Sequence, residues 1–219
     1  MRYSQKYLDD IRKKIPSLAF SLFAKHGIEP VTMQDVADAC NMGIATMYRY
    51  YGTKLSLVIQ IAAEQWDAFA QEMEAKFRQT VPSTATAREN LIFYMKSLIG
   101  LYEDHPQLLQ FNDYFHIYTT NAQASMQDML PYYQATRYFR DQFHEIYMKA
   151  RKDHSIRTDI PETELYFGIM HAILCAATKF AQGVIYPLGE PLDPHQALEM
   201  QSHAFLDFLT STEEIPITI

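Results

Sequence analysis

Residues 32–51 read Thr-Met-Gln-Asp-Val-Ala-Asp-Ala-Cys-Asn-Met-Gly-Ile-Ala-Thr-Met-Tyr-Arg-Tyr-Tyr, and this stretch decides the fold of the N-terminal part. Thr32 is a suitable N-cap for a short helix over 33–40. The tight turn at 41–43 begins with Asn, which tolerates a left-handed backbone, and a second short helix follows over 44–51. The pattern predicts two short helices joined by a tight turn, that is, a helix-turn-helix.

The two predicted helices have different faces. Val36, Ala37 and Cys40 form the inner face of the first helix, and the small Ala37 permits a steep crossing with the second helix, whose Met47 packs inward. The outward residues of the second helix are small at its start and polar, aromatic or cationic near its end: Gly43, Ile44, Ala45, Thr46, Tyr48, Arg49 and Tyr50. Such a face is typical of a recognition helix whose N-terminal end enters the DNA major groove.

Residues 11–58 resemble the DNA-binding domain of TetR-family transcriptional regulators. The shared motifs are Leu22-Phe23-Ala24-Lys25-His26-Gly27, Thr32 with Asp35-Val36-Ala37, and Thr46-Met47-Tyr48-Arg49-Tyr50-Tyr51 followed by Lys54. The resemblance implies that Thr32, Tyr48 and Lys54 contact DNA phosphates. It implies in addition a set of residues that face the groove or its edges: Gln34, Ile44, Ala45, Thr46 and Tyr50.

The turn departs from the family pattern. Members usually show Gly-Val-Ser there, whereas this chain has Asn41-Met42-Gly43. Gly43 therefore lacks the side-chain cap that Ser offers. Ile44 is apolar where many members carry a polar residue, so it either contacts a thymine methyl group or only fills space. Both departures affect the operator sequence more than DNA binding itself.

Composition excludes several classes of protein. The chain has 219 residues, of which 48% are hydrophobic and 21% charged, as expected of a globular fold. Cys40 and Cys175 lie far apart, which argues against a disulfide scaffold or a Cys-rich zinc module. The N-terminus has no apolar leader, and the longest apolar stretch, 165–177, is shorter than the roughly 20 residues that span a bilayer. We therefore expect a soluble, cytoplasmic protein with no membrane partner.

The net charge of −7 is unevenly distributed along the chain. Residues 1–58 contain eight Lys and Arg against five Asp and Glu, whereas residues 59–219 contain 11 against 21. A basic end on an acidic body is compatible with nucleic-acid binding by that end, although uneven charge alone is modest evidence.

Helical periodicity runs through most of the chain and predicts an all-α fold of about nine helices without strands. The first helix either starts near Ile15, with Pro16 in its first turn, or is kinked at Pro16, and it stops at Gly27. The other predicted helices span 33–40, 44–51, 54–79, 85–103, 106–120, 126–153, 162–185 and 194–210. We predict a helix-turn-helix DNA-binding domain over 1–53 and a ligand-binding and dimerisation domain over 54–219.

Large adaptable side chains are abundant after residue 59, and Met and aromatic residues suit a pocket for apolar or aromatic ligands. Ordinary core packing at helical spacing remains the alternative for each of them. The family resemblance implies such a pocket, and the residues predicted to line it are Trp66, Phe69, Tyr94, Phe111, Phe115, Tyr118, Phe143 and His171.

The last two predicted helices are apolar around most of their circumference, so they must be covered on nearly all sides. TetR-like proteins use their last two long helices in a four-helix dimer interface, and the resemblance implies a homodimer here. The predicted interface residues are Leu165, Ile169, Ile173, Ala177, Leu198, Phe205 and Phe208. A purely internal core is the alternative.

Enzymatic and metal sites are not predicted. His195, Glu199 and His203 lie four residues apart on one helix face, where solvated pairing is favoured over zinc binding. No nucleotide-binding or hydrolase motif is present in the sequence, and no cofactor is expected. The predicted function is that of a homodimeric repressor, released from a near-palindromic DNA operator by a small, largely apolar or aromatic effector. The alternative is a helical small-molecule sensor without sequence-specific DNA binding.

Overall fold

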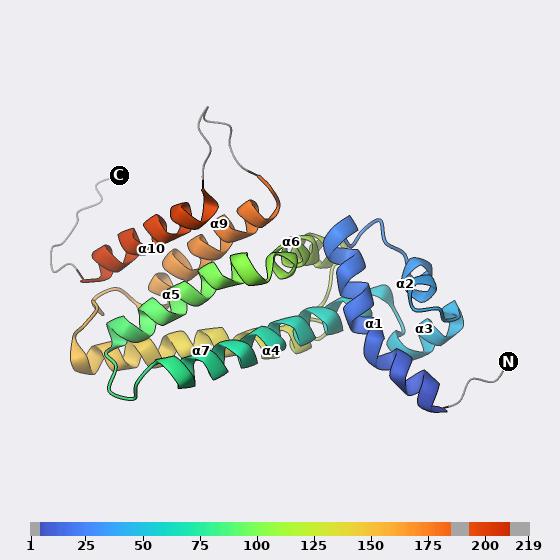
Figure 1. Ribbon diagram of the computed structural model, residues 1–219, viewed down its shortest axis with the longest axis horizontal. Coiled ribbons are helices and arrows are strands. Elements are labelled where there is room, and N and C mark those ends of the chain that lie inside the picture. Colours follow the sequence, from blue (N-terminus) through green and yellow to red (C-terminus); the bar gives the residue numbers. More distant parts are fainter. Residues whose placement is uncertain (1–4, 185–192, 211–219) are drawn as a thin grey trace. The chain divides into compact units, whose positions relative to one another are not determined.

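The protein is described here by a computed structural model that covers residues 5–184 and 193–210, with side chains described from residue 14 onward. Within these ranges every regular element is a helix, which confirms the all-α prediction (Figure 1). The elements are α1 (Gln5–His26), α2 (Met33–Ala39), α3 (Ile44–Tyr51), α4 (Lys54–Thr80), α5 (Ala87–Asp104), α6 (Pro106–Asn121), α7 (Leu130–Asp153), α8 (Glu162–Leu165), the π-helix η1 (Tyr166–His171), α9 (Ala172–Ala181) and α10 (Pro194–Thr210).

The segments α8, η1 and α9 follow one another without a break, so the described residues form nine continuous helices, as predicted. The predicted helix over 162–185 ends earlier, at Ala181, and its last predicted residue lies outside the described ranges. At the other end of the chain, α1 runs through Pro16 and therefore does not start near Ile15. It stops where predicted, because Gly27 has a φ of +81° that ends the helix.

Side-chain caps explain where several helices begin. Thr32 and Thr86 each accept a hydrogen bond from the backbone N–H three residues on, and each forms a capping box at the start of α2 or α5. The hydroxyl of Thr53 accepts from the N–H of Ser56 at 3.0 Å, which confirms the predicted start of α4. Between α3 and α4, Gly52 has a φ of +69°, in the region that favours glycine.

The packing divides the described residues into two compact units, namely those within 1–70 and 106–137, and those within 71–105 and 138–210. Helices α4 and α7 each supply residues to both units, so these packing units cut the chain differently from the predicted division after residue 53. That division concerns function and remains a prediction.

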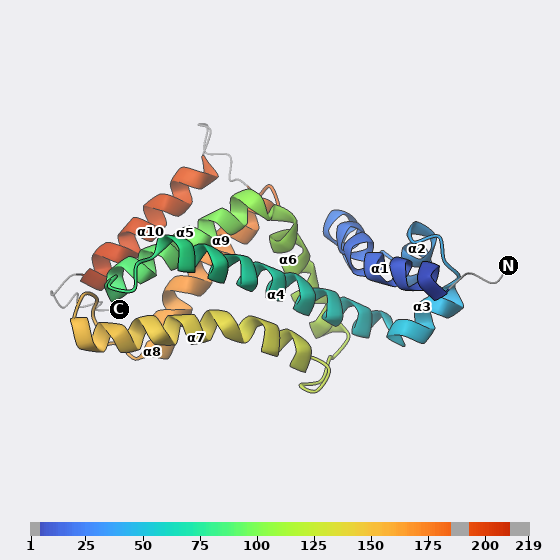
Figure 2. The same cartoon turned by 60° about the horizontal axis from the view of Figure 1, so that its bottom comes forward.

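The first unit contains the helix-turn-helix, and α1 packs against both α2 and α6. Phe111 of α6 is fully buried, and its ring centroid lies 5.3 Å from that of Phe20 and 6.5 Å from that of Phe23 on α1. In the second unit α5, α9 and α10 pack against one another (Figure 2). The rings of Tyr102 and Phe180, 6.3 Å apart, belong to the contact between α5 and α9.

Candidate nucleic-acid interface and ligand pocket

The interior of the helix-turn-helix is as predicted. Val36, Ala37 and Met47 have no exposed surface, and Cys40 is 5% exposed. Asn41 adopts a φ of 52°, the left-handed conformation expected of it, and α2 and α3 pack against each other. The buried side chains fix the orientation of α2 relative to α3, so the exposed residues of the two helices form one continuous surface.

That outer surface brings most of the predicted DNA-binding residues of α3 together. Tyr48 is 50% exposed, and Arg49 is exposed with its guanidinium 5.4 Å from the centroid of the Tyr50 ring. Of the other predicted α3 positions, Gly43 and Ala45 are exposed, whereas Ile44 and Thr46 are half-buried. The accessible groups are small at the start of α3 and carry a phenol and a cation further along, which suits base-edge contacts followed by phosphate contacts.

The start of α2 has a tightly bonded cap. The Thr32 hydroxyl donates to Asp35 Oδ2 at 2.7 Å and accepts from the Asp35 N–H, and the Thr32 N–H donates to the same carboxylate at 2.7 Å. These hydrogen bonds hold the pKa of Asp35 below its usual value. Gln34 is exposed beside this cap, and its amide donates to Asp38 at 2.7 Å. The Thr32 hydroxyl proton is therefore already committed to Asp35.

Gly43 is the N-cap of α3 and, as predicted, makes no side-chain capping bond. Its φ of −74° and ψ of 139° are accessible to any L-residue, and an added Cβ would meet no heavy atom within 4 Å. The first turn of α3 therefore has no side-chain acceptor at its N-cap.

Lys54, the first residue of α4, is half-buried. Its ammonium donates to the backbone carbonyl of Glu29 at 3.0 Å and lies 5.0 Å from the centroid of the Tyr118 ring. Burial lowers the pKa of Lys54, and the charges of Glu29 and Asp35 oppose that shift. The resemblance implies a phosphate contact for this residue, but its ammonium is bonded within the protein here.

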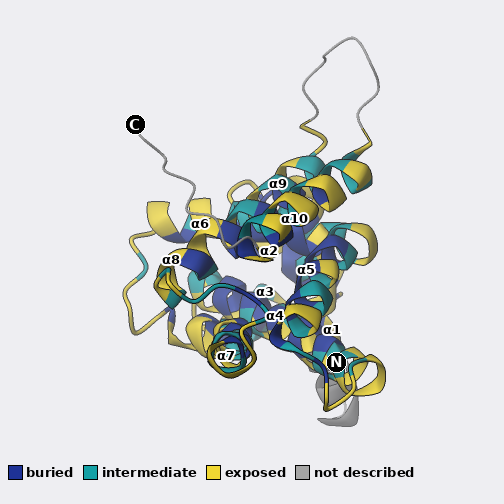
Figure 3. Ribbon diagram, turned by 90° about the vertical axis from the view of Figure 1, so that its left-hand side faces the viewer, coloured by how far each residue is buried: buried dark blue, intermediate teal, exposed yellow. Residues whose placement is uncertain are grey.

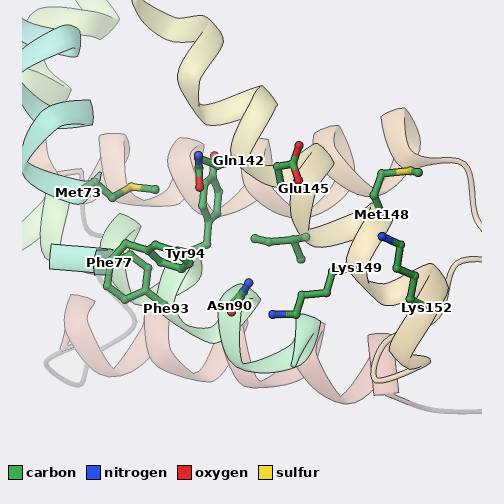
Figure 4. Close-up of a pocket in the computed structure, with 11 residues that line it drawn as sticks. Met73, Phe77, Asn90, Phe93, Tyr94, Gln142, Glu145, Met148, Lys149 and Lys152 are labelled. Atoms are coloured by element: carbon green, nitrogen blue, oxygen red, sulfur yellow. The ribbon is translucent and has the colours of Figure 1, made fainter. Parts of the chain in front are cut away.

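A pocket of about 410 Å³ lies in the second unit among α4, α5 and α7 (Figure 4). Its apolar wall comes from α4 and α5, chiefly Met73, Phe77 and Phe93, and a row of α7 residues forms the opposite side. The α7 residues are Gln142, Glu145, Ile146, Met148, Lys149 and Lys152, and α5 adds Asn90 and Tyr94.

Polar groups of the pocket are concentrated on α5 and α7. The Asn90 Oδ1 atom is buried and accepts no hydrogen bond from the residues that the structure describes. In Figure 4 the Lys149 side chain extends toward Asn90. The Tyr94 hydroxyl donates to the Phe139 carbonyl at 2.8 Å, and burial raises its pKa well above the usual value. A ligand group that donates a hydrogen bond to Asn90 and carries negative charge near Lys149 fits this end.

Of the residues predicted to line a pocket, Tyr94 lines this one, and the others are not among its lining residues. Phe111 and Phe115 are fully buried and stack with centroids 6.1 Å apart in the core of the first unit. Trp66 is also buried there and donates to Asn112 at 3.1 Å. Of the remaining residues, Phe69 and Phe143 are buried, Tyr118 lies beneath Lys54, and His171 is exposed.

Most of the pocket-lining residues were not predicted from the sequence, because aromatic residues were expected to line the pocket. The polar members Asn90, Gln142 and Lys149 fit the polar side of an amphipathic helix and are not distinguishable from solvated residues in one sequence. Met73 and Phe77 on the predicted helix over 54–79 could have indicated the pocket, because both are large apolar side chains.

Most residues predicted for a dimer interface are already covered within one chain. Leu165, Ile169, Ile173, Ala177 and Leu198 are buried, and Phe205 and Phe208 are half-buried. Contacts of α9 with α5 and α10 contribute to this burial. In Figure 3, α9 and α10 show exposed residues (yellow) beside buried ones (dark blue). The exposed apolar side chains here are those of Phe167, 54% exposed, and Met200, 71% exposed.

The structure also describes the helix face of His195, Glu199 and His203, for which solvated pairing was favoured over zinc binding. His195 Nε2 lies 3.4 Å from Glu199 Oε1, which is the predicted i,i+4 pairing, whereas its contact with Glu103 of α5, at 2.6 Å between Nδ1 and Oε1, was not predicted. Across the described residues, no group of three or more His, Cys, Asp or Glu side chains could hold a metal ion. Nor does any helix in those ranges combine the length and apolarity needed to cross a membrane.

Comparison with known proteins agrees with this architecture. Residues 15–61 match the family model of bacterial regulatory proteins, tetR family. The transcriptional repressor KstR2 of Rhodococcus jostii is 24% identical over 179 residues, which cover 77% of this chain and 78% of the relative. The repressor KstR of Mycobacterium tuberculosis is 24% identical over 119 residues, or 52% of its length.

Solved structures share the fold over nearly the whole chain. The regulator FadR of Bacillus subtilis, determined with stearoyl-CoA, has a TM-score of 0.66 at 17% identity and covers 93% of this chain and 100% of its own. The structure of AibR with isovaleryl coenzyme A and operator DNA has a TM-score of 0.63 at 18% identity, covering 91% of this chain and 98% of its own.

Proposed function

We propose that the chain is a tetR-family regulator, namely a homodimeric repressor that leaves a near-palindromic operator when a small, largely apolar ligand binds. The match of residues 15–61 to the tetR family model and the similarity to KstR2 support this proposal. The observation that carries the proposal is the exposed face of α3, where Ala45, Tyr48 and Arg49 are accessible and have no role in the core. With two copies related by a twofold axis, the two α3 helices would enter successive major grooves about 34 Å apart.

The pocket among α4, α5 and α7 is the proposed effector site. Its volume of about 410 Å³ lies in the range of small-molecule sites, and its Met and Phe side chains adapt to the shape of an apolar body. The buried Asn90 Oδ1 and the Lys149 ammonium favour a polar, acidic end on the ligand. The acyl-CoA ligands of FadR and AibR are molecules of this kind, which supports an acyl compound as the effector.

Helix α4 supplies the proposed connection between ligand and DNA. It carries Met73 and Phe77 at the pocket, and its first residue follows α3 after only Gly52 and Thr53. A ligand that binds better to a conformation unsuited to the operator shifts the population away from DNA. By linkage, operator DNA must weaken ligand binding by the same factor.

The proposed dimer face is the exposed side of η1, α9 and α10, with Phe167 and Met200 as its apolar side chains. This choice differs from the more buried residues that the sequence analysis predicts for the interface. It keeps the predicted helices, since the exposed residues alternate with the buried ones on the same helical segments.

Selection from a pool of random duplexes with purified protein tests DNA binding. Recovery of a near-palindrome with half-sites one helical turn apart supports a dimeric sequence reader. Binding with a steep salt dependence but no enriched sequence means that only phosphate contacts are made and contradicts the operator proposal. Absence of binding by ligand-free protein favours the sensor without sequence-specific DNA binding.

Release of a labelled operator by saturated fatty acids and their CoA thioesters tests the effector site. Lys149→Met should raise the concentration needed for release by about tenfold, the value of one charge-assisted hydrogen bond. Lys96→Met is the matched control, because Lys96 is exposed on α5 and does not line the pocket. Equal effects of the two substitutions would contradict the assignment of the pocket.

A further inference from the structure

The helix that runs from α8 to α9 contains one turn of a different kind. The residues of η1 form a π-helix, whose backbone hydrogen bonds join residues five apart instead of four, so the turn holds one residue more than the α turn it replaces. When the wide turn moves along the helix, each residue that it passes rotates by about 100° around the axis, the angle between successive residues. The turn thus allows discrete alternative arrangements of the same backbone.

Both flanks of η1 are anchored to other helices of the second unit. The Tyr147 hydroxyl on α7 directs its proton to the carbonyls of Thr158 and Ile160, at 3.1 and 3.0 Å, just before α8. At the first residue of α8, Glu162 Oε2 lies 2.9 Å from His144 Nδ1 on α7. On the other side, α9 packs on α5 and α10. Movement of the wide turn is therefore confined to η1.

The first residue of η1 contacts the pocket among α4, α5 and α7. The hydroxyls of Tyr166 and Tyr94 are hydrogen-bonded, and Tyr94 lines the pocket (Figure 4). The Tyr94 proton goes to the Phe139 carbonyl at 2.8 Å, so Tyr166 is the donor of the bond between the two phenols. The ring centroids of Tyr166 and Phe143 lie 5.4 Å apart, and Phe143 follows the lining residue Gln142 on α7. Tyr166 thus contacts two of the three pocket helices.

The next residue of η1 lies at the surface. Phe167 is 54% exposed, and its ring centroid is 5.4 Å from that of Tyr166 and 6.4 Å from that of the exposed His171. Between them, Ile169 and Met170 are buried and hold the turn against the core. A pocket contact and a residue of the proposed dimer face therefore lie side by side on one π turn.

We propose that η1 couples the effector pocket to the dimer face: a ligand that displaces Tyr94 moves the wide turn, and Phe167 moves with it. The inference rests on the effector site and the dimer face of the proposed function. By linkage, a ligand that changes the stability of the dimer must bind the dimer and the monomer with affinities that differ by the same factor.

Hydrogen–deuterium exchange tests the connection from the pocket to η1, with stearoyl-CoA as the ligand. In the parent protein, stearoyl-CoA should slow amide exchange in the pocket segments of α5 and α7 and change the exchange rate across 166–171 by about fivefold. Tyr166→Phe removes the hydroxyl and keeps the ring, so its pocket segments should respond as in the parent, whereas 166–171 should change by less than about twofold. Tyr102→Phe is the matched control with the full response, because Tyr102 contacts Phe180 of α9, at 6.3 Å between ring centroids, but does not line the pocket.

Fluorescence-detected sedimentation velocity tests the connection from η1 to the dimer face. Stearoyl-CoA should change the dimer dissociation constant of the parent and of Tyr102→Phe by about tenfold, but that of Tyr166→Phe by less than about twofold. Deletion of Gly168 removes the extra residue of the turn, and Gly168 is exposed with no heavy atom within 4 Å of an added Cβ, so no packing contact is lost. The deletion variant should bind stearoyl-CoA, and the ligand should leave its dimer dissociation constant unchanged.

The outcomes separate the coupling from the function on which it rests. Protection of the pocket segments with no change at 166–171 would overturn the coupling while the effector site stands. A full response in Tyr166→Phe, or after deletion of Gly168, would overturn the route through the π turn. No protection of the pocket segments by stearoyl-CoA would instead overturn the proposed effector site, and a parent protein that is monomeric at every concentration would overturn the proposed dimer. In either of these two cases the coupling fails with the function.

Discussion

At the scale of single residues, the two glycines that flank α3 differ in backbone conformation. Gly43 has a φ of −74°, which any residue adopts, whereas Gly52 has a φ of +69°. Neither position has a heavy atom within 4 Å of an added Cβ, so space does not distinguish them. Substitutions at these glycines therefore separate backbone strain from packing.

Gly43→Ser should raise the free energy of unfolding by about 0.4–1 kcal/mol, because it restricts the unfolded chain and supplies the missing N-cap acceptor. Gly52→Ala should lower it by about 1–2 kcal/mol, the cost of a Cβ in a left-handed conformation. Urea unfolding of the two variants beside the parent protein measures both changes. The same sign for both would show that the backbone conformations at Gly43 and Gly52 are not as described.

The Asp35 carboxylate predicts a dependence of stability on pH. Its hydrogen bonds to Thr32 lower its pKa from the usual 3.8, so the ionised form stabilises the folded state above that pH. This contribution is fully present above pH 3.8 and is lost as the pH falls through the lowered pKa. Asp35→Asn should therefore be less stable than the parent at neutral pH, and the difference should shrink below pH 3.8.

Thermal unfolding of the parent protein and Asp35→Asn from pH 7 to pH 3 measures that difference. Asp128→Asn serves as the control, because Asp128 forms the same kind of capping bonds with Ser125 outside the helix-turn-helix. Both differences should shrink together with acidification, whereas only Asp35→Asn should alter DNA binding. A difference that grows as the pH falls would contradict the direction of the pKa shift.

At the scale of the elements, α3 carries the prediction for DNA recognition. Tyr48→Phe should weaken operator binding by about 1 kcal/mol, roughly fivefold, through the loss of one hydroxyl contact to a phosphate. Folding stability and ligand affinity should not change, since Tyr48 is half exposed and lies outside the pocket. Fluorescence anisotropy with a labelled operator measures the effect.

Tyr133→Phe is the matched control, because Tyr133 is 43% exposed on α7, outside the helix-turn-helix. It should bind the operator as tightly as the parent protein. Equal losses for Tyr48→Phe and Tyr133→Phe, or a parallel loss of ligand affinity, would contradict the assignment of α3 as the recognition helix.

Helix ends were predictable where the cause is local. Thr32, Thr53 and Gly27 act on the residues next to them, so their effect is readable in one sequence, and α2, α3 and α4 begin where expected. Of the two alternatives for α1, a start near Ile15 is excluded, because Pro16 lies inside a helix that begins at Gln5. The π-helical turn η1 was not predicted, since the periodicity of 166–171 is compatible with an ordinary α-helix.

Sites that depend on long-range packing were harder to predict. The periodicity of a helix shows which side chains are apolar, but not whether another part of the same chain covers them. Phe115 and Trp66 lie in the core of the first unit and do not line the described pocket, and Ile173 is buried within one chain. The pocket needs α4, α5 and α7 together, and its polar members have no local signature.

At the scale of the whole molecule, the proposed dimer predicts a change in mass. Phe167→Asp should produce a monomer, because burial of each Phe167 side chain contributes about 1.5–3 kcal/mol and a carboxylate there would have to be desolvated. Light scattering after size-exclusion chromatography measures the mass. Met126→Glu is the control, since Met126 is 76% exposed but lies outside the proposed dimer face, and its mass should match that of the parent. A dimeric Phe167→Asp variant would contradict this choice of face.

The unequal burial of the two thiols makes the native chain suitable for site-specific labelling. Cys40 is buried inside the helix-turn-helix, and burial raises its pKa, whereas Cys175 is exposed on α9. A maleimide fluorophore should therefore attach at Cys175 without any engineered cysteine. Cys175 also lies on the helical segment proposed to pair with a second copy, so its alkylation rate should fall as the protein concentration rises. One native side chain thus provides a reporter of subunit association.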